Sequence, residues 1–391
     1  NMSYFEDGVT VIPMNAQQGD VLNFSDFAES IELIPLETRD DCLIGWIPEI
    51  IATKNHYVLI SGIGPTDFQH LYVYDKNGKF IRQISARGQG GEEFLEVRDI
   101  DVIGDSIIKM GDVYVIRTFN LEGKQLSSKR INGTTQEIVS VKGKTILFDG
   151  GSYSSSKATN LLFQFDEKDD LQAEFFEIPP FANRITSFFV NPRALTRDED
   201  SVYFHFPYNN YIYQINAETL EYSPRYKVDY GDRTFTWDMF DENVGHVKDW
   251  VAQSKNEKNA SMCEILSLND YFLFTSRDND RNYYLSLYSN RTGRVLSGNK
   301  LKDDMYFKGN VIVLKGGKSS AVLGRHGNDG GDLIWPVQPK VLLDGYEAYR
   351  DVLSKERWEL FRKKYPRLVE VCEQLNEDDN PVLLKIKLKD F

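Results

Sequence analysis

The sequence has little of what marks a membrane protein or a nucleic-acid-binding protein. No stretch approaches the roughly 18 consecutive apolar residues of a membrane helix, and residues 1–10 lack the basic and then apolar pattern of a signal peptide. Basic residues are in the minority, with 46 Lys and Arg against 59 Asp and Glu, and the formal net charge is −13. We therefore expect no membrane span and no nucleic-acid partner, because a phosphate-binding surface needs an excess of basic groups.

Cysteine and histidine are too sparse for the common metal motifs. Cys42, Cys263 and Cys372 lie far apart, which excludes a CxxC metal knuckle. We expect buried thiols, and a disulfide between two of them stays open if the chain is exported. The five histidines never fall within four residues of one another, so HExxH is absent, although distant ligands can still converge in the fold. A GxSxG nucleophile motif is also missing.

What the sequence repeats is a hairpin of alternating apolar and polar residues around a polar turn. The clearest copy runs over residues 71–84, and four more follow along the chain. Successive turns at Gly78, Gly123, Asp169 and Thr219 are 45, 46 and 50 residues apart, the period of one four-stranded propeller blade. The longer step after the fourth turn indicates an insertion at 229–259 with apolar residues at helical spacing. Each repeat also has a tightly linked strand pair before its hairpin.

These repeats predict an all-β fold, a six-bladed β-propeller of four-stranded antiparallel blades with small helical insertions. Segments 30–36 and 381–388 are both strand-like, and pairing them in a shared sixth blade would close the ring and leave no open edge. We expect the first strands of that blade between residues 304 and 344. The chain then forms a single domain over 1–391, with an N-terminal extension at 1–28, a helical insert at 229–259 and a helical segment at 345–376.

The lengths of the expected loops suggest where a ligand would bind. Turns between first and second strands are short, whereas loops on the opposite face are long, at 62–69, 150–159, 178–186 and 229–259. Long loops on one face of a rigid scaffold commonly carry function. The binding candidates there are cationic and aromatic: Arg87, Arg98, His205, Tyr208, Trp237, Arg277, His326 and Trp335. They would suit a carboxylated or sugar-like ligand. The alternative is structural, with the rings packed between blades and the arginines bonded to loop carbonyls.

Two further segments have some features of ligand loops. Residues 87–94 are glycine-rich, yet neither Lys-Ser nor Lys-Thr follows and a strand comes next, so a phosphate loop is not predicted. Residues 328–332 and 278–280 look like fragments of calcium loops but lack the further acidic ligand that such loops need. No cofactor is therefore predicted, and calcium or another divalent ion in the channel stays open.

Segment 71–81 followed by 87–94 resembles the blade junction of NHL-type and TolB-like six-bladed propellers. It is most similar to propeller proteins of unknown function among the envelope lipoproteins of Bacteroides-type bacteria, whose opening and closing strands also resemble segments 31–38 and 379–384. That family usually has GPGEF where this chain has Gly-Gly-Glu-Glu-Phe at 90–94. The resemblance implies export, to the periplasm or as an outer-membrane lipoprotein with an anchor upstream of Asn1, and it leaves activity open.

Two functions follow as expectations. The first is a monomeric, non-catalytic binding or interaction module of the cell envelope, which takes a glycan, a peptide or an envelope protein at the long-loop face of the channel. The second is a propeller lyase or hydrolase that uses a channel histidine or metal, with His205 and His326 as candidates. Fold alone does not choose between them.

Overall fold

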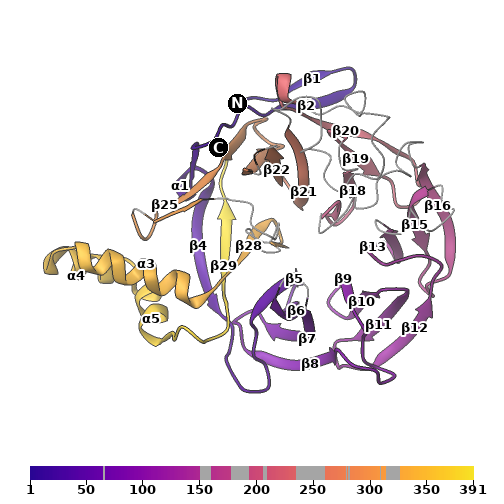
Figure 1. Ribbon diagram of the computed structural model, residues 1–391, viewed down its shortest axis with the longest axis horizontal. Helices are drawn as coiled ribbons and strands as arrows, with labels where there is room; N and C mark the ends of the chain where they lie inside the picture. The colour runs from indigo at the N-terminus through magenta and orange to yellow at the C-terminus, as the bar shows by residue number, and fades with distance from the viewer. Residues whose placement is uncertain are drawn as a thin grey trace.

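The alternating segments form short strands, and the strands assemble into a ring of sheets in the computed structural model of the chain (Figure 1). The structure describes residues 1–64, 67–149, 160–177, 193–205, 209–234, 260–278, 280, 282–308, 310–313 and 326–391. Six four-stranded antiparallel arrangements surround a central channel, which confirms the predicted six-bladed β-propeller. The second and third strands of a blade read as nearly continuous buried runs, because both faces of a blade pack against its neighbours.

The first three blades follow the predicted repeat. Blade 1 contains β5 (Trp46–Ala52), β6 (His56–Gly64), β7 (Asp67–Asp75) and β8 (Phe80–Ala86). Blade 2 contains β9 (Val97–Ile103), β10 (Ile107–Asp112), β11 (Val115–Asn120) and β12 (Gln125–Arg130). Blade 3 contains β13 (Glu137–Val141), β14 (Lys144–Phe148), β15 (Asn160–Phe165) and β16 (Leu171–Glu177). The outer hairpins turn at glycines in the left-handed region, with φ of 83° at Gly78 and 91° at Gly123.

The last three blades keep the same order from channel to rim. Blade 4 contains β17 (Leu195–Arg197), β18 (Val202–His205), β19 (Tyr211–Ile215) and β20 (Tyr222–Asp229). Blade 5 contains β21 (Ala260–Leu268), β22 (Tyr271–Asp278), β23 (Tyr283–Ser289) and β24 (Val295–Gly298). Blade 6 contains β27 (Gly327–Asp329), β28 (Asp332–Val337), β29 (Val382–Leu388) and β4 (Ala28–Pro35). The first two strands of blade 6 thus lie within the predicted window 304–344.

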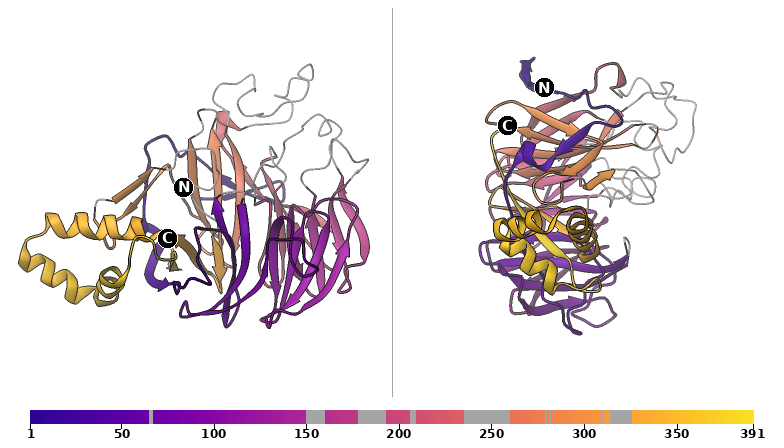
Figure 2. Two further views of the ribbon diagram at one scale, coloured as in Figure 1. Left: turned by 60° about the horizontal axis from the view of Figure 1, so that its bottom comes forward. Right: turned by 90° about the vertical axis from the view of Figure 1, so that its left-hand side faces the viewer.

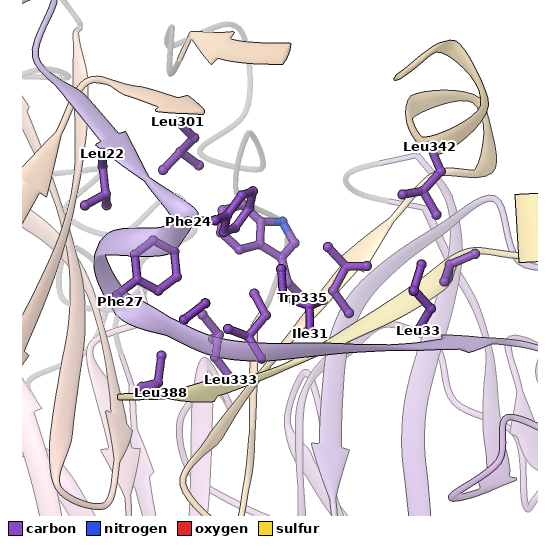
Figure 3. Packing of buried hydrophobic residues seen from close by; sticks show 14 of the residues in the cluster. Leu22, Phe24, Phe27, Ile31, Leu33, Leu301, Leu333, Trp335, Leu342 and Leu388 are labelled. Carbon is purple, nitrogen blue, oxygen red and sulfur yellow. The ribbon is translucent and has the colours of Figure 1, made fainter. Parts of the chain in front are cut away.

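Blade 6 closes the ring by pairing the two ends of the chain. Strand β29 is antiparallel to β4, with Val382 opposite Pro35, Leu384 opposite Leu33 and Ile386 opposite Ile31. The predicted pairing of 31–36 with 382–388 is confirmed. The inward side chains join a hydrophobic cluster around Phe24, Phe27, Leu333 and Trp335 (Figure 3).

The N-terminal residues add strands to the rim. The strands β1 (Tyr4–Glu6) and β2 (Val9–Pro13) extend blade 4, because β2 pairs in parallel with β20. A small separate sheet contains β3 (Val21–Asn23), β25 (Lys300–Asp303) and β26 (Asn310–Val313), and the short helix α1 (Phe24–Phe27) leads from β3 into β4. The segment that we expected to be an extension is therefore built into the sheets.

Three helices project from the ring beside blade 6 (Figure 2). They are α3 (Pro339–Val352), α4 (Lys355–Lys364) and α5 (Pro366–Gln374), so the helical segment begins earlier than the predicted residue 345. Pro366 starts α5 and separates it from α4, as the sequence indicated. Of the insert at 229–259, residues 229–234 are described and include the short 3₁₀ helix η2 (Gly231–Arg233); the remainder lies outside the described residues.

Two further observations concern membrane helices and the cysteines. Within them, no helix is long and apolar enough to cross a membrane. Cys42 and Cys372 are buried as expected, whereas Cys263 is partly exposed.

Candidate functional site

The first strand of every blade lines the central channel, which contains a cavity of about 760 Å³. All six blades contribute to its wall. The cavity reaches the turns between first and second strands, where Lys54, Asp105, Lys142, Glu199 and Asn269 stand around the opening. This cavity thus opens at the end of the channel with short turns, which we call the tight-turn end.

Buried carboxylates join neighbouring inner strands. Asp99 accepts a hydrogen bond from the Ile138 amide at 2.9 Å, and Asp101 accepts one from the Ser140 amide at 2.6 Å. Glu137 of the next blade accepts from two amides of the blade after it. Because the channel edge of an inner strand has no strand beside it, these carboxylates satisfy backbone donors that would otherwise face the channel unpaired.

Arg197 on β17 links three blades through Asp101. Its Nε and Nη2 donate to the two oxygens of the Asp101 carboxylate at 2.6 and 2.8 Å, a bidentate pair. The Asp101 charge raises the pKa of Arg197 despite burial of the guanidinium. Asp101 is on blade 2 and also bonds Ser140 of blade 3, so one carboxylate holds blades 2, 3 and 4 together.

Arg193, immediately before β17, spans the channel in the other direction. Its Nη2 donates to Glu49 Oε1 on blade 1 at 2.5 Å, and its Nη1 donates to the main-chain oxygen of His326 beside blade 6 at 2.6 Å. The Arg193 and Glu49 side chains are only 12% and 7% exposed. This arrangement joins blade 4 to the opposite side of the ring.

Charge in the cavity wall is unequal, with seven acidic and four basic side chains. Both arginines are already paired with carboxylates. At the opening, the Asp198 carboxylate bonds two turn amides through Oδ1 only, and neither its other oxygen nor the exposed Glu199 has a hydrogen-bond partner among the described residues. The tight-turn end therefore presents negative charge that is free to meet a ligand.

The predicted binding residues are placed in several blades. Tyr208 and Trp237 lie outside the described residues, as do most of the predicted long loops. Arg87 is exposed in the link between blades 1 and 2, and Arg98 lies on β9 with an ion pair to Glu96 at 3.1 Å. Arg277 is half-buried near the end of β22. These residues do not meet in the tight-turn cavity, and the long-loop face remains a prediction.

The remaining three candidates are buried. His205 is fully buried, with its two ring nitrogens 3.4 Å from the Tyr211 carbonyl and 3.2 Å from the Met262 carbonyl. His326 packs edge-on against Trp335 at 4.6 Å, and its Nε2 has no hydrogen-bond partner in the described structure. Burial lowers the pKa of His205 to about 4 and that of His326 to about 3. Trp335 is 7% exposed and lies in the core beside Phe24 (Figure 3).

Sequence reasoning missed the charged residues of the inner strands. The available signal was polar residues within otherwise apolar first strands, as in Asp99 and Asp101 at period two along β9. Both faces of an inner strand are buried against neighbouring blades, and its free edge lies along the channel. A carboxylate on such a strand must therefore bond a neighbouring blade or a ligand. That inference needs the blade assignment first.

Potential metal ligands do not gather among the residues that the structure describes. Among them, no cluster of three or more His, Cys, Asp or Glu could hold a metal ion. Asp329, in one of the segments that resembled a calcium loop, instead pairs with Lys76 at 2.8 Å and Lys385 at 3.1 Å. In the other segment, Asp278 accepts hydrogen bonds from Asn282, and residue 279 lies outside the described residues.

Comparisons with known proteins identify a family and a fold. A family model described as "Domain of unknown function (DUF4934)" matches residues 9–387. The crystal structure of a Bacteroides fragilis protein classed as exported is similar at a TM-score of 0.66 and 16% identity, covering 97% of this chain and 100% of that one. Two weaker similarities are to the extracellular domain of a protein assigned as a one-component system of B. thetaiotaomicron (TM-score 0.38, 14% identity, 79% of this chain and 32% of that one) and to BamB from Moraxella catarrhalis (0.37, 12%, 68% and 66%). No curated protein matches the sequence.

Proposed function

The chain belongs to the family described as Domain of unknown function (DUF4934), and we propose that it is a non-catalytic binding module of the bacterial cell envelope. Its ligand is a basic segment of a peptide or protein, held at the tight-turn end of the channel. The observation that carries this proposal is the cavity of about 760 Å³, to which all six blades contribute and whose wall has more acidic than basic side chains.

The charge of the wall favours a cationic ligand. A cleft lined by an excess of one sign of charge, with low-dielectric walls, concentrates the opposite charge. The Arg193 and Arg197 guanidiniums are neutralised by Glu49 and Asp101, so they add little attraction for an anion. These carboxylates and Asp329 are likewise engaged, so the attraction for a cation rests on the carboxylates at the opening. Asp198 and Glu199 at the opening are the groups placed to meet Lys or Arg side chains of a partner.

Two features support a non-catalytic role. The candidates for a catalytic base, His205 and His326, are buried, so a substrate in solvent cannot reach them. Burial also lowers their pKa values, which makes both rings weak bases. The inner-strand carboxylates are already engaged in bonds between blades.

Fluorescence anisotropy with labelled pentalysine and pentaglutamate tests the proposal. We expect pentalysine to bind and pentaglutamate not to bind. Replacing both opening carboxylates, Asp198→Asn with Glu199→Gln, should weaken pentalysine binding about fivefold, and the effect should shrink at high salt.

A matched variant controls for net charge. Glu356→Gln with Glu359→Gln removes the same two charges from helix α4, which lies outside the ring (Figure 2). This variant should bind pentalysine as the unaltered protein does. Equal weakening in the two double variants would mean that only the overall charge of −13 attracts the peptide, and the channel site would be rejected.

The envelope location is part of the proposal. It is supported by the family resemblance at the chain ends and by the similarity to a B. fragilis protein classed as exported. Fractionation of the native host with an antibody to this chain tests it. Recovery with cytoplasmic markers would contradict it.

A further inference from the structure

A second cavity lies between blades 1 and 2 and shares Asp105 with the wall of the channel cavity. It has a volume of about 250 Å³ and is bounded by the start of β6, by β8 and by the two turns of blade 2 that face them. Its polar side chains include His56, Arg82 and Asn120, and Val73 and Ile81 supply apolar wall. Because typical pockets for drug-sized ligands occupy roughly 300–1,000 Å³, only a small molecule fits.

The Asp105 carboxylate holds the histidine of this cavity in place. His56 Nδ1 lies 2.8 Å from Asp105 Oδ1, and Thr53 and Asn55 also donate to the same carboxylate. Burial opposes ionisation of Asp105, but these hydrogen bonds outweigh it and lower its pKa to about 2. Asp105 is therefore ionised at neutral pH and accepts a hydrogen bond from His56 Nδ1–H. The other ring nitrogen, Nε2, is then the atom of His56 that can hydrogen-bond a ligand.

Arg82 supplies a cation with unused donors. Its Nη1 donates to the Glu122 main-chain oxygen at 3.0 Å, which orients the guanidinium toward blade 2. Its other N–H groups make no hydrogen bond to the described residues and can form the two-pronged contact that arginine makes with a carboxylate. Glu122 is also one of the residues that line the cavity, and it brings a negative charge to this turn.

We propose that this inter-blade cavity binds a small carboxylate that also carries a hydroxyl group, as an acidic sugar or a hydroxy acid does. Arg82 binds the carboxylate, and His56 Nε2 forms a hydrogen bond with the hydroxyl group. Val73 and Ile81 contact the carbon skeleton. Asp105, already saturated by three donors, does not compete for Arg82. This site does not depend on the ligand proposed for the channel.

Three probes of known composition test the proposal: D-glucuronate, L-lactate and D-glucose. Binding is followed by long-range ¹H–¹⁵N NMR of the five histidines, in which the His56 resonances report on the cavity. We expect D-glucuronate or L-lactate to shift the His56 signals at millimolar concentration, and D-glucose to leave them unchanged. A response to D-glucuronate alone identifies an acidic sugar, and a response to L-lactate alone identifies a hydroxy acid. No response to either, or an equal response to D-glucose, would overturn the proposal.

Variants on the exposed surface separate binding from folding. Arg82→Gln should weaken the responding probe about tenfold, because it removes the charged fork. Arg130→Gln, an exposed arginine on the outer strand of blade 2, is the matched control and should have no effect. Glu122→Gln should strengthen binding about twofold, since it removes a repelling charge. Unchanged affinity in Arg82→Gln, or weakened binding in Glu122→Gln, would contradict the assignment.

Discussion

Single buried side chains hold the blades of this ring in place. Asp101 bonds a backbone amide of blade 3 and the guanidinium of Arg197 from blade 4, while it belongs to blade 2 itself. Arg193 performs a similar task across the channel. Because an unpaired buried charge costs several kcal/mol, each member of these pairs depends on its partner. The same residues shape the cavity wall, so stability and the binding surface are coupled at this scale.

Two buried histidines should make the protein sensitive to acid. Burial lowers the pKa of His205 to about 4 and of His326 to about 3, whereas an unfolded histidine titrates near 6.5. The unfolded chain therefore binds more protons below pH 6.5, and the free energy of unfolding falls as the pH drops from 6.5 toward 4. We expect a loss of about 2 kcal/mol per histidine between pH 7 and pH 5, measured by urea denaturation.

The comparison is with the variant in which both residues are changed to glutamine. This protein should start less stable at pH 7, because two buried rings are replaced. Its stability should then vary less between pH 7 and pH 5. If the variant and the unaltered protein lose the same free energy over this range, other groups cause the acid sensitivity.

At the scale of elements, exposed sheet edges are covered unevenly around the ring. Strand β2 covers the outer edge of blade 4, and β4 is the outer strand of blade 6. The outer strands of blades 1, 2 and 3 have register shifts where they pair with the third strand, and so do the outer strands of blades 4 and 6. Such irregularities discourage pairing with another chain, which is the hazard of an open edge.

The N-terminal hairpin should contribute to the stability of the domain through β2. Ile12 on β2 is fully buried against blades 4 and 5, whereas Phe5 on β1 is 72% exposed. Ile12→Ala should reduce the free energy of unfolding by about 2–4 kcal/mol through the cavity it leaves. Phe5→Ala, a larger truncation at the surface, should change it by less than about 0.5 kcal/mol. Similar small effects from both in chemical denaturation would show that β2 is a dispensable extension.

At the scale of the whole molecule, the pairing of β4 with β29 is what makes the ring continuous. It joins residues about 350 positions apart, so it forms only when the whole chain is folded. Removing residues 381–391 should lower the melting temperature of the entire domain in one transition. An unchanged melting temperature in calorimetry would show that the closure contributes nothing to stability.

An engineered disulfide between β4 and β29 tests the same closure by strengthening it. Ser30 and Lys387 are directly opposite on β4 and β29, and both are exposed. Changing both to cysteine should allow a disulfide that raises stability by about 2–4 kcal/mol when oxidised, because it restrains the unfolded chain. The reduced form of the same protein is the control. A disulfide that forms without raising the melting temperature would show that opening of the β4–β29 pair does not limit the stability of the ring.

The architecture was predictable because it depends on local patterns. The hairpin at Gly78 and its later copies could be recognised from alternation and turn residues alone, and their spacing indicated the blade. The channel network was not predictable in the same way. Arg193 is 144 residues from Glu49, and nothing in the local sequence of either indicates the other. The placement of Trp335 in the core, when a ligand contact was expected, has the same cause.

The six-bladed ring, its four-stranded blades and the closure by the two chain ends thus followed from the amino-acid pattern, since period-two alternation and a repeat of about 45 residues are properties of neighbouring positions. Which side chains meet in the channel and between blades 1 and 2 depends instead on the folded arrangement of the blades. Those contacts are between first strands and turns of different blades, and their geometry is set by how the blades pack. A charge in an inner strand is recognisable as a blade link or a ligand contact only once its neighbours in space are known.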